Sequence, residues 1–554
     1  MRVPCNITNL VLTYLEERQR LTGIDFSLSE FHKRVYAPLL SVNREWREAV
    51  MRRLVRECDF TIDFPITSPV ASYPFAVELF TPEVYPMGAL VREVTLHLNF
   101  EGIANGDVSQ ILTSPECLVN GFTQATNLNV EIFTSNVIVE EYDIEDVIGY
   151  VDDTVSAIKR ILPMACNIAV KDNMLHLILG DKLSKASGRL MQKLLNVSTK
   201  SAICYTSFID DTAKYASLTY LTHIEYDVTG NSKKHMRIIH QNAGSLQELC
   251  ISYNGLAQGP KLIMDSAGTL FTYPRLERLK LTSTSVIGQM SYPVFEEHVP
   301  FPSLRNAELM VDYPFGDDTL FRGNSDTLES LCIVTDERLE QILEKYNVFS
   351  GEEYKSLKSV TFEINSTTFT RSGAMSSQAH MQILSCLPNV TKFAAKGMSG
   401  ESRFLTQQPY LNNLQSIRVL DLGRKFLSLS GIITLLQNMT QLSVLRCISS
   451  SVTYEVPYAE LGDHIGRLHE KLYPLARHLK VLDLLTTGHK YTDNEVDDYV
   501  NILACLAVIC PSFFPAQMDP AMAGRFNKSL RSLIDDNLFA KHSDSLRRLF
   551  IAKR

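Results

Sequence analysis

The chain has 554 residues, of which 45% are hydrophobic and 21% charged, values that fit a folded protein and exclude wholesale disorder. Its net charge of −8 has the wrong sign for a protein that holds nucleic acid by neutralising phosphates, so we expect no nucleic-acid partner. Its 11 cysteines form no CxxC pair and no run of about 18 apolar residues occurs, so we expect a cytoplasmic or nuclear protein without membrane association.

Residues 1–57 are predicted to be helical and contain the single tryptophan of the chain. Apolar residues recur at steps of three and four from Ile7 to Leu15, behind Pro4, which predicts a short amphipathic helix. A second helix is predicted from a further apolar face at helical spacing. This face consists of Val42, Trp46, Val50 and Leu54.

Four short motifs of this segment occur in a characteristic order, namely Pro4, Tyr14-Leu15, Leu39-Leu40 and Val42-Asn43-Arg44-Glu45-Trp46. The segment resembles an F-box in this order of motifs. It departs from the family at Val3, where a leucine is usual, and in residues 16–35, which form an insertion. The resemblance implies that the module binds a small adaptor subunit, which links it to the cullin scaffold of a ubiquitin ligase, while a C-terminal repeat domain holds the substrate.

The resemblance also implies a set of adaptor-binding residues. Trp46 would either bind the adaptor or pack the module. Alternatively, these helices only cap the open N-terminal end of a repeat array, because terminal repeats need shielding. The implied adaptor-binding residues are Pro4, Ile7, Leu10, Leu15, Leu39, Leu40, Val42 and Trp46.

Residues 58–215 are predicted to form divergent early repeats. Alternating apolar residues predict strands around 91–98, 128–132 and 175–179. Between the second and third of these strands, apolar residues at helical spacing predict an amphipathic helix over 139–162, which Pro163 ends.

Residues 216–490 contain a recurring hexapeptide with apolar residues at positions 1, 4 and 6, as in Leu276-Glu277-Arg278-Leu279-Lys280-Leu281. Most intervals between copies lie near the period of about 20–29 residues that is typical of leucine-rich repeats. Positions 4 and 6 alternate along a short strand and are expected to point into a shared core. The copies start at Leu221, Leu246, Leu276, Leu304, Leu328, Leu357, Val390, Ile417, Leu442 and Leu479.

Residues 491–554 are predicted to cap the C-terminal end of the array. Apolar faces predict helices over 494–510 and 526–539, and Leu546, Leu549 and Ile551 predict a last strand. The complete fold prediction is α/β: a leucine-rich-repeat solenoid, with a curved array of parallel strands and helices on the convex side, preceded by the small helical F-box-like module.

The outward positions of the strands are the expected binding surface, since a solenoid offers an extended concave face. In three late repeats, position 3 is a valine and position 5 is charged. The capping helices are the alternative explanation of this apolar stripe, because they would cover it. The predicted substrate-binding residues are Val419, Asp421, Val444, Arg446, Val481 and Asp483.

The sequence contains no HExxH, GxxxxGK[ST] or GxSxG motif, so we expect no catalytic residues, no metal site and no cofactor. The leading hypothesis is a non-catalytic substrate-recognition subunit of a cullin-type ubiquitin ligase, whose partners transfer ubiquitin to a protein substrate that the sequence does not identify. The alternative is a leucine-rich-repeat scaffold for protein interactions, in which the N-terminal helices serve only as a cap.

Overall fold

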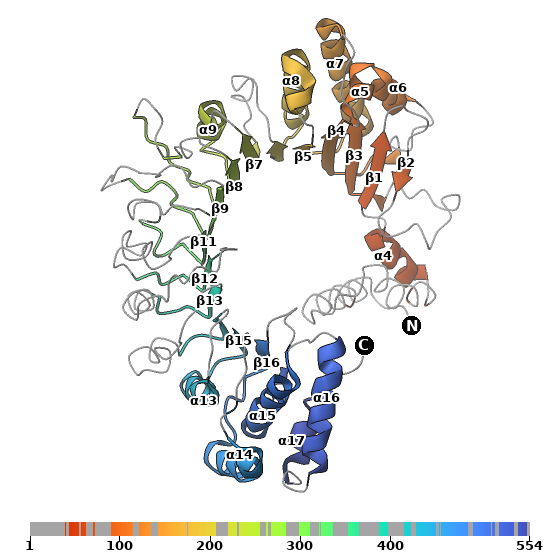
Figure 1. Cartoon of the computed structure of the whole chain (residues 1–554). Helices are drawn as coiled ribbons and strands as arrows, with labels where there is room; N and C mark the ends of the chain where they lie inside the picture. The colour runs from red at the N-terminus through yellow and green to blue at the C-terminus, as the bar shows by residue number, and fades with distance from the viewer. Residues whose placement is uncertain are drawn as a thin grey trace. The chain divides into compact units, whose positions relative to one another are not determined.

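The structure, a computed structural model, divides into two compact units, residues 1–252 and 253–554. Each unit is an α/β arrangement built on parallel strands (Figure 1). The residues that the structure describes are 11, 39, 42, 44–54, 57–62, 70–72, 90–114, 121–134, 142–173, 176–206, 220–229, 232–254, 262–263, 268–283, 298–310, 321, 323–335, 353–364, 387–396, 415–422, 428–449, 454, 456–485, 491–510, 512–515, 520–536 and 541–550.

The first unit contains a sheet with the strand order β2-β1-β3-β4-β5-β6-β7. Every pairing in it is parallel except that of β2, which runs antiparallel to β1. The strands are β1 (Glu57–Ile62), β2 (Val70–Ser72), β3 (Glu93–Asn99), β4 (Asn127–Phe133), β5 (Asn167–Asp172), β6 (Ser201–Thr206) and β7 (Leu221–Thr229). A further strand, β8 (Glu248–Asn254), spans the end of this unit and the start of the next.

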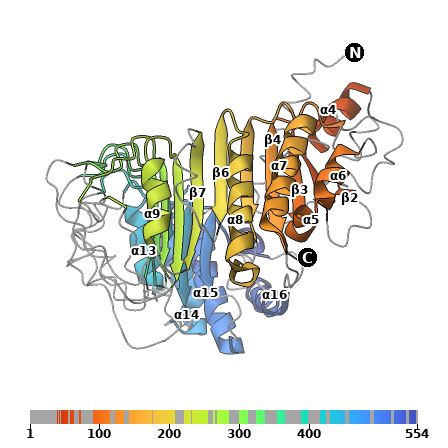
Figure 2. The ribbon, with the colours of Figure 1, turned by 90° about the horizontal axis from the view of Figure 1, so that it is seen from above.

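Helices connect these strands and lie along one face of the sheet (Figure 2). The predicted amphipathic helix is confirmed as α7, which is capped at its start by Asp143, whose side chain accepts a hydrogen bond from the Glu145 N–H, and ends before Pro163. These helices are α5 (Phe100–Ala104), α6 (Asp107–Thr113), α7 (Ile144–Ile161), α8 (His176–Leu195) and α9 (Ser232–Gln241), whereas α4 (Arg44–Leu54) precedes β1.

The predicted strands at 91–98 and 128–132 are confirmed as β3 and β4, but the strand predicted at 175–179 is wrong. Residues 176–195 form α8, and its buried residues lie at helical spacing, from Leu183 and Ala186 to Leu190 and Leu194. The strand of this repeat lies earlier, as β5, with Ile168 and Val170 buried. Three alternating leucines are too few to distinguish a strand from the first turns of a helix.

The second unit contains a wholly parallel sheet in which each strand pairs with the next along the chain, from β9 to β17. Its strands are β9 (Arg278–Ser283), β10 (Asn306–Met310), β11 (Ser330–Thr335), β12 (Ser359–Ile364), β13 (Lys392–Lys396), β14 (Val419–Asp421), β15 (Val444–Ser449), β16 (Val481–Leu485) and β17 (Phe514–Pro515). Its helices are α13 (Leu429–Asn438), α14 (Tyr458–Leu472), α15 (Asp493–Ile509), α16 (Pro520–Asp535) and α17 (Ser543–Arg547).

The apolar positions of the hexapeptide form the core of this sheet, as predicted. In the repeat that contains β9, Leu276, Leu279 and Leu281 are at most 1% exposed. The next repeats bury their corresponding side chains to a similar degree, from Leu304 to Leu484. Each side chain of this size contributes roughly 1.5–3 kcal/mol when it is fully buried, before the cost of ordering is subtracted.

One backbone arrangement recurs between successive parallel strands from β3 to β6 in the first unit and from β9 to β16 in the second. The backbone carbonyl of position 2 of the hexapeptide accepts hydrogen bonds from two or more consecutive N–H groups of the next repeat. The Thr391 carbonyl, for example, accepts from Arg418 at 2.7 Å and from Val419 at 3.0 Å. We call this arrangement the shared-carbonyl joint. The other accepting carbonyls belong to Arg92, Thr126, Cys166, Glu277, Arg305, Glu329, Lys358, Arg418 and Ser443. The same joint therefore occurs within each of the two units.

The C-terminal helices are confirmed in part. Helix α15 matches its prediction, whereas α16 begins at Pro520, earlier than expected. The predicted last strand is wrong, because Leu546 lies in α17 and the Leu549 N–H donates to its carbonyl in a turn. A three-residue step between leucines also fits a helical turn. Ile551 lies outside the described residues.

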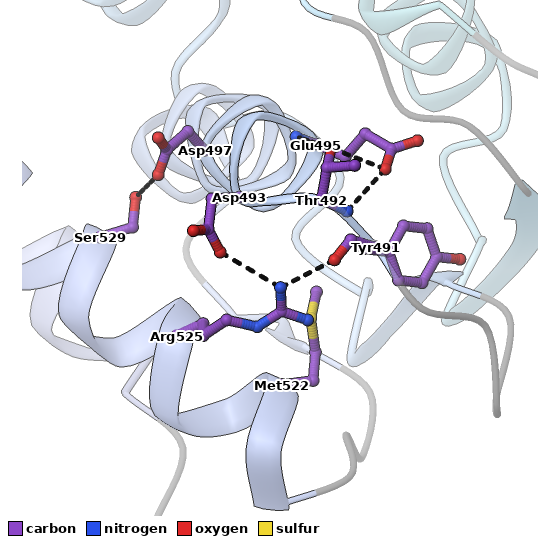
Figure 3. A network of polar contacts seen from close by, with 8 residues as sticks. All are labelled: Tyr491, Thr492, Asp493, Glu495, Asp497, Met522, Arg525 and Ser529. Atoms are coloured by element: carbon purple, nitrogen blue, oxygen red, sulfur yellow. Dashed lines mark hydrogen bonds and ion pairs between the residues drawn. The ribbon is translucent and has the colours of Figure 1, made fainter.

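Helices α15 and α16 are joined by polar contacts (Figure 3). The Arg525 guanidinium donates to the Tyr491 carbonyl at 2.7 Å and lies 3.2 Å from Asp493, while the Ser529 hydroxyl donates to Asp497. The first turn of α15 also carries a capping box between Thr492 and Glu495. No helix in the described part of the chain is long and apolar enough to cross a membrane.

Candidate protein-interaction surfaces

In the N-terminal module the structure describes α4 and, before it, Val11, Leu39 and Val42. The Val42 N–H donates to the Leu39 carbonyl at 3.2 Å, and Val42 is 56% exposed. The helix therefore starts two residues later than Val42, and this residue faces solvent instead of lying on the predicted apolar face.

Within α4 the apolar face is packed. Ala49, Val50 and Met51 are buried and Trp46 is half-buried. Leu39, Val42 and Trp46 are thus the predicted adaptor-binding residues that the structure describes. The remaining ones, Pro4, Ile7, Leu10, Leu15 and Leu40, lie outside the described residues.

The six predicted substrate-binding residues are brought together in two rows across β14, β15 and β16. Val419 is in register with Val444, and Val444 with Val481. The second row consists of Asp421, Arg446 and Asp483, in the same register. Adjacent strands lie about 4.8 Å apart, so each row is a line of neighbouring side chains. We call these two rows, together with the exposed residues Lys392, Arg418 and Lys480 next to them, the late-repeat face.

The members of the late-repeat face differ in their exposure. The three valines are half-buried, and the Arg446 side chain is 49% exposed. Asp421, in contrast, is only 6% exposed, and its carboxylate lies 4.0 Å from the Arg446 guanidinium. Asp421 therefore supports Arg446 and does not itself offer a contact surface, which corrects the expectation that it faces outward like its neighbours.

Asp483 lies close to the C-terminal helices. Burial raises the pKa of Tyr499 on α15, and the negative charge of Asp483 raises it further. Tyr499 is 1% exposed, and its ring packs 5.8 Å from that of Phe526 on α16. Asp483 thus lies where the late-repeat face meets the C-terminal helices.

Other charged positions of the second unit are paired across neighbouring strands. Lys280 lies 2.8 Å from Glu308, and Glu329 lies between Arg305 at 2.9 Å and Lys358 at 3.6 Å. These pairs are solvent-exposed, so each contributes at most about 1 kcal/mol to stability. Each of them holds a cation next to an acid of the neighbouring repeat.

The sequence prediction missed a polar network on the first unit. His97, Glu131 and Lys171 occupy one row across β3, β4 and β5, with His97 3.3 Å and Lys171 3.6 Å from the Glu131 carboxylate. In the same sheet the Asn129 amide donates to Glu93 at 2.7 Å. The signal that identifies these residues is the alternation of polar with buried apolar residues along β3 and β4.

Three of the described cysteines, Cys204, Cys505 and Cys510, are buried. Burial raises the pKa of Cys204, Cys505 and Cys510 to about 12 in each case, so these thiols are neutral at physiological pH. Among the residues that the structure describes, no group of three or more histidine, cysteine or acidic side chains lies close enough to hold a metal ion. The arrangement of rows on a sheet face suits binding of another molecule.

These features define the class of the molecule as an α/β protein with a parallel sheet made of recurring strand units. No model of a known protein family matches the chain, and no curated protein matches it in sequence.

Proposed function

We propose that this protein is the substrate-recognition subunit of a cullin-type ubiquitin ligase, acting in the cytoplasm or nucleus. The F-box-like N-terminal module binds the adaptor subunit, and leucine-rich repeats hold a protein substrate. The protein transfers nothing itself, because ubiquitin transfer belongs to its partners.

The observation that carries this proposal is the order of two kinds of structure. The exposed residue Val42 and the helix α4 precede an array of parallel strands in which side chains of neighbouring strands are aligned by register. A docking module followed by a repeat surface is the arrangement expected of a receptor that connects a substrate to a larger assembly.

Co-precipitation with the adaptor tests the proposal. We expect the full chain to recover the adaptor and Leu39→Asp/Leu40→Asp to lose it, because two carboxylates would enter an apolar interface. Val444→Asp is the matched control, since it makes the same kind of change on the late-repeat face and should leave recovery unchanged. Equal recovery by the wild type and the double variant, or none by either, would contradict the proposal.

A second candidate function is a repeat scaffold without a ligase, in which α4 is only a cap. The complete burial of Val50, at 0% exposure, favours it, because a packed helix shields apolar surface. Deleting residues 1–56, up to the start of β1, distinguishes the two functions. A cap predicts a broadened unfolding transition at lower temperature, whereas an adaptor-binding module predicts a repeat array that melts nearly unchanged and recovers no adaptor.

A further inference from the structure

We propose that the late-repeat face binds an extended, acidic peptide segment of a partner protein that also carries apolar anchor residues. This inference rests on the proposed function in one respect, namely that the repeat array holds a protein partner. It goes further by assigning the chemical class of the segment that is bound.

The apolar component of the face is the row Val419, Val444 and Val481. Strand register places these side chains next to one another, and each is half-buried. An apolar strip of this kind, bordered by charged residues, has the composition of an interface centre surrounded by a polar rim. It supplies the contact for apolar anchors.

The cationic component is Lys392, Arg418 and Lys480, which are next to members of the valine row in strand register or in sequence. Lys392 occupies position 3 of β13, in register with Val419, whereas Arg418 and Lys480 directly precede Val419 and Val481. All three side chains are exposed. Within the part of the chain that the structure describes, none of the three forms an ion pair, so their charge is available to a partner.

Comparison with the middle repeats shows why this charge is distinctive. Position 2 there carries Glu277, Arg305, Glu329 and Lys358 in succession, two acids and two cations, and Glu329 pairs with both of its neighbours. In the late repeats, position 2 carries Thr391, Arg418, Ser443 and Lys480 in succession. The neighbours of Arg418 in this row are neutral, and so is Ser443, which precedes Lys480. The same row is thus balanced in the middle of the array and positive at its end.

Arg446 adds a fourth cation in the middle of the face. Its side chain is 49% exposed and lies 4.0 Å from the carboxylate of Asp421, which is itself covered. The described charges on the face are then four cations against Asp421 and Asp483. Electrostatic complementarity therefore favours an acidic ligand, and such charges mainly set its rate of association and its selectivity.

The geometry favours a peptide over a nucleic acid. Aliphatic side chains provide no stacking platform for bases, and a chain of net charge −8 repels a polyanion outside this patch. The face from β13 to β16 spans three strand separations of about 4.8 Å each, a length that roughly four or five residues of extended peptide cover. A short linear segment is sufficient to contact all of its rows.

Fluorescence anisotropy with labelled peptides and the full chain tests this inference. The probe is a peptide of about a dozen residues with Leu or Phe at every third position and Asp or Glu elsewhere. Two matched peptides replace either the acids by Lys or the apolar residues by Ser. A single-stranded oligothymidylate of similar length is the nucleic-acid probe. We expect the acidic, apolar peptide to bind most tightly and its affinity to fall with rising salt.

The variants separate local from general electrostatics. Lys392→Glu/Arg418→Glu/Lys480→Glu should weaken binding of the acidic, apolar peptide by about tenfold or more. Lys159→Glu/Arg160→Glu/Lys200→Glu is the control, because it makes the same change in net charge at three exposed cations of the first unit and should leave binding unchanged. Circular dichroism of both variants verifies that each remains folded.

Each outcome decides the inference. Equal binding by the wild type and the first triple variant, preference for the lysine peptide, or tighter binding of the oligothymidylate would overturn it. The proposed function can fail separately. If the full chain binds the peptide but does not recover the adaptor, this inference holds and the protein is a scaffold, not a ligase subunit. If the full chain recovers the adaptor but does not bind the peptide, this inference is wrong and the proposed function as a ligase subunit stands.

Discussion

Asn324 forms a buried connection between neighbouring repeats of the second unit. It is 0% exposed, and its side-chain amide donates to the Phe301 carbonyl at 2.5 Å and to the Thr327 hydroxyl at 3.2 Å. Asn324→Ala leaves the Phe301 carbonyl without this donor, so we expect a loss of about 1–2 kcal/mol in the free energy of unfolding. Urea denaturation measures this loss. Ser303→Ala, which removes an exposed hydrogen bond to Pro274, should cost clearly less; equal losses would contradict the assignment.

The cysteines are expected to differ in reactivity. Cys250 and Cys332 are partly exposed, whereas Cys204 is 2% exposed and its pKa is raised to about 12 by burial. Since the thiolate is the reactive form, iodoacetamide at mildly alkaline pH should modify Cys250 and Cys332 well before Cys204. Mass spectrometry of the digested protein gives the order. In urea the three rates should become similar, and similar rates in the native protein would show that Cys204 is not buried.

At the level of single residues, the sequence predicted the core well where the repeated residues are large. Leu279 and Leu281 were identified by their spacing alone and are buried. In the first unit, Ala125 and Ala165 occupy position 1 of their repeats and are also buried, at 0% and 8% exposure. A search for leucines overlooks them, because a small side chain at this position carries little hydrophobic signal although it packs in the same place.

At the level of elements, helices α7 and α8 are joined by Asp152. Its carboxylate binds Arg189 at 2.7 Å and Lys193 at 2.7 Å, and the hydrogen bond from Arg189 is the main reason why the pKa of Asp152 is lowered. All three side chains are about one-third exposed, so solvent screening limits the effect. We expect Asp152→Asn to cost about 0.5–1 kcal/mol at neutral pH.

The stabilisation that Asp152 provides is expected to depend on pH. A carboxyl group whose pKa is lower in the folded than in the unfolded state stabilises the fold above the unfolded pKa, near 3.8, and loses this effect as the pH falls through the folded value. The difference between wild type and Asp152→Asn in urea denaturation should therefore be constant above about pH 5 and shrink in stronger acid. Asp153→Asn, at the exposed neighbouring position, is the control, and an equal effect there would contradict a specific contribution of the ion pairs of Asp152 with Arg189 and Lys193.

The elements that were predicted wrongly share a physical cause. Leu175, Leu177 and Leu179 alternate, and Leu546 and Leu549 follow the hexapeptide spacing. In the structure, however, Leu177 and Leu179 lie in α8, and Leu546 lies in α17 with Leu549 in the turn that follows. Short apolar patterns fit both periods, and packing against neighbouring elements then decides. The long patterns of α7 and α15 contain several turns and were predicted correctly. The rows of the late-repeat face were predictable because register follows from repeat spacing, whereas the burial of Asp421 depends on tertiary packing.

At the level of the whole molecule, strands pair with their neighbours in sequence, so stability is expected to be distributed along the chain. Leu96→Ala in β3 and Leu420→Ala in β14 each remove a side chain that is 0% exposed, and each should cost about 2–5 kcal/mol. We expect hydrogen exchange to accelerate mainly in peptides of residues 1–252 for the first variant and of residues 253–554 for the second. Uniform acceleration over both units by either variant would show one cooperative unit instead.

The shared-carbonyl joint has a consequence for how such a chain changes in length. Each joint contains the same backbone groups whatever side chains its residues carry, as at Lys358, Thr391 and Arg418. Excision of residues 391–417 would bring the N–H groups of Arg418 and Val419 to the Lys358 carbonyl and put Val390 in place of Ile417. A complete repeat is thus an interchangeable segment, and the chain can be lengthened by duplication or shortened by deletion without the need for a new kind of junction.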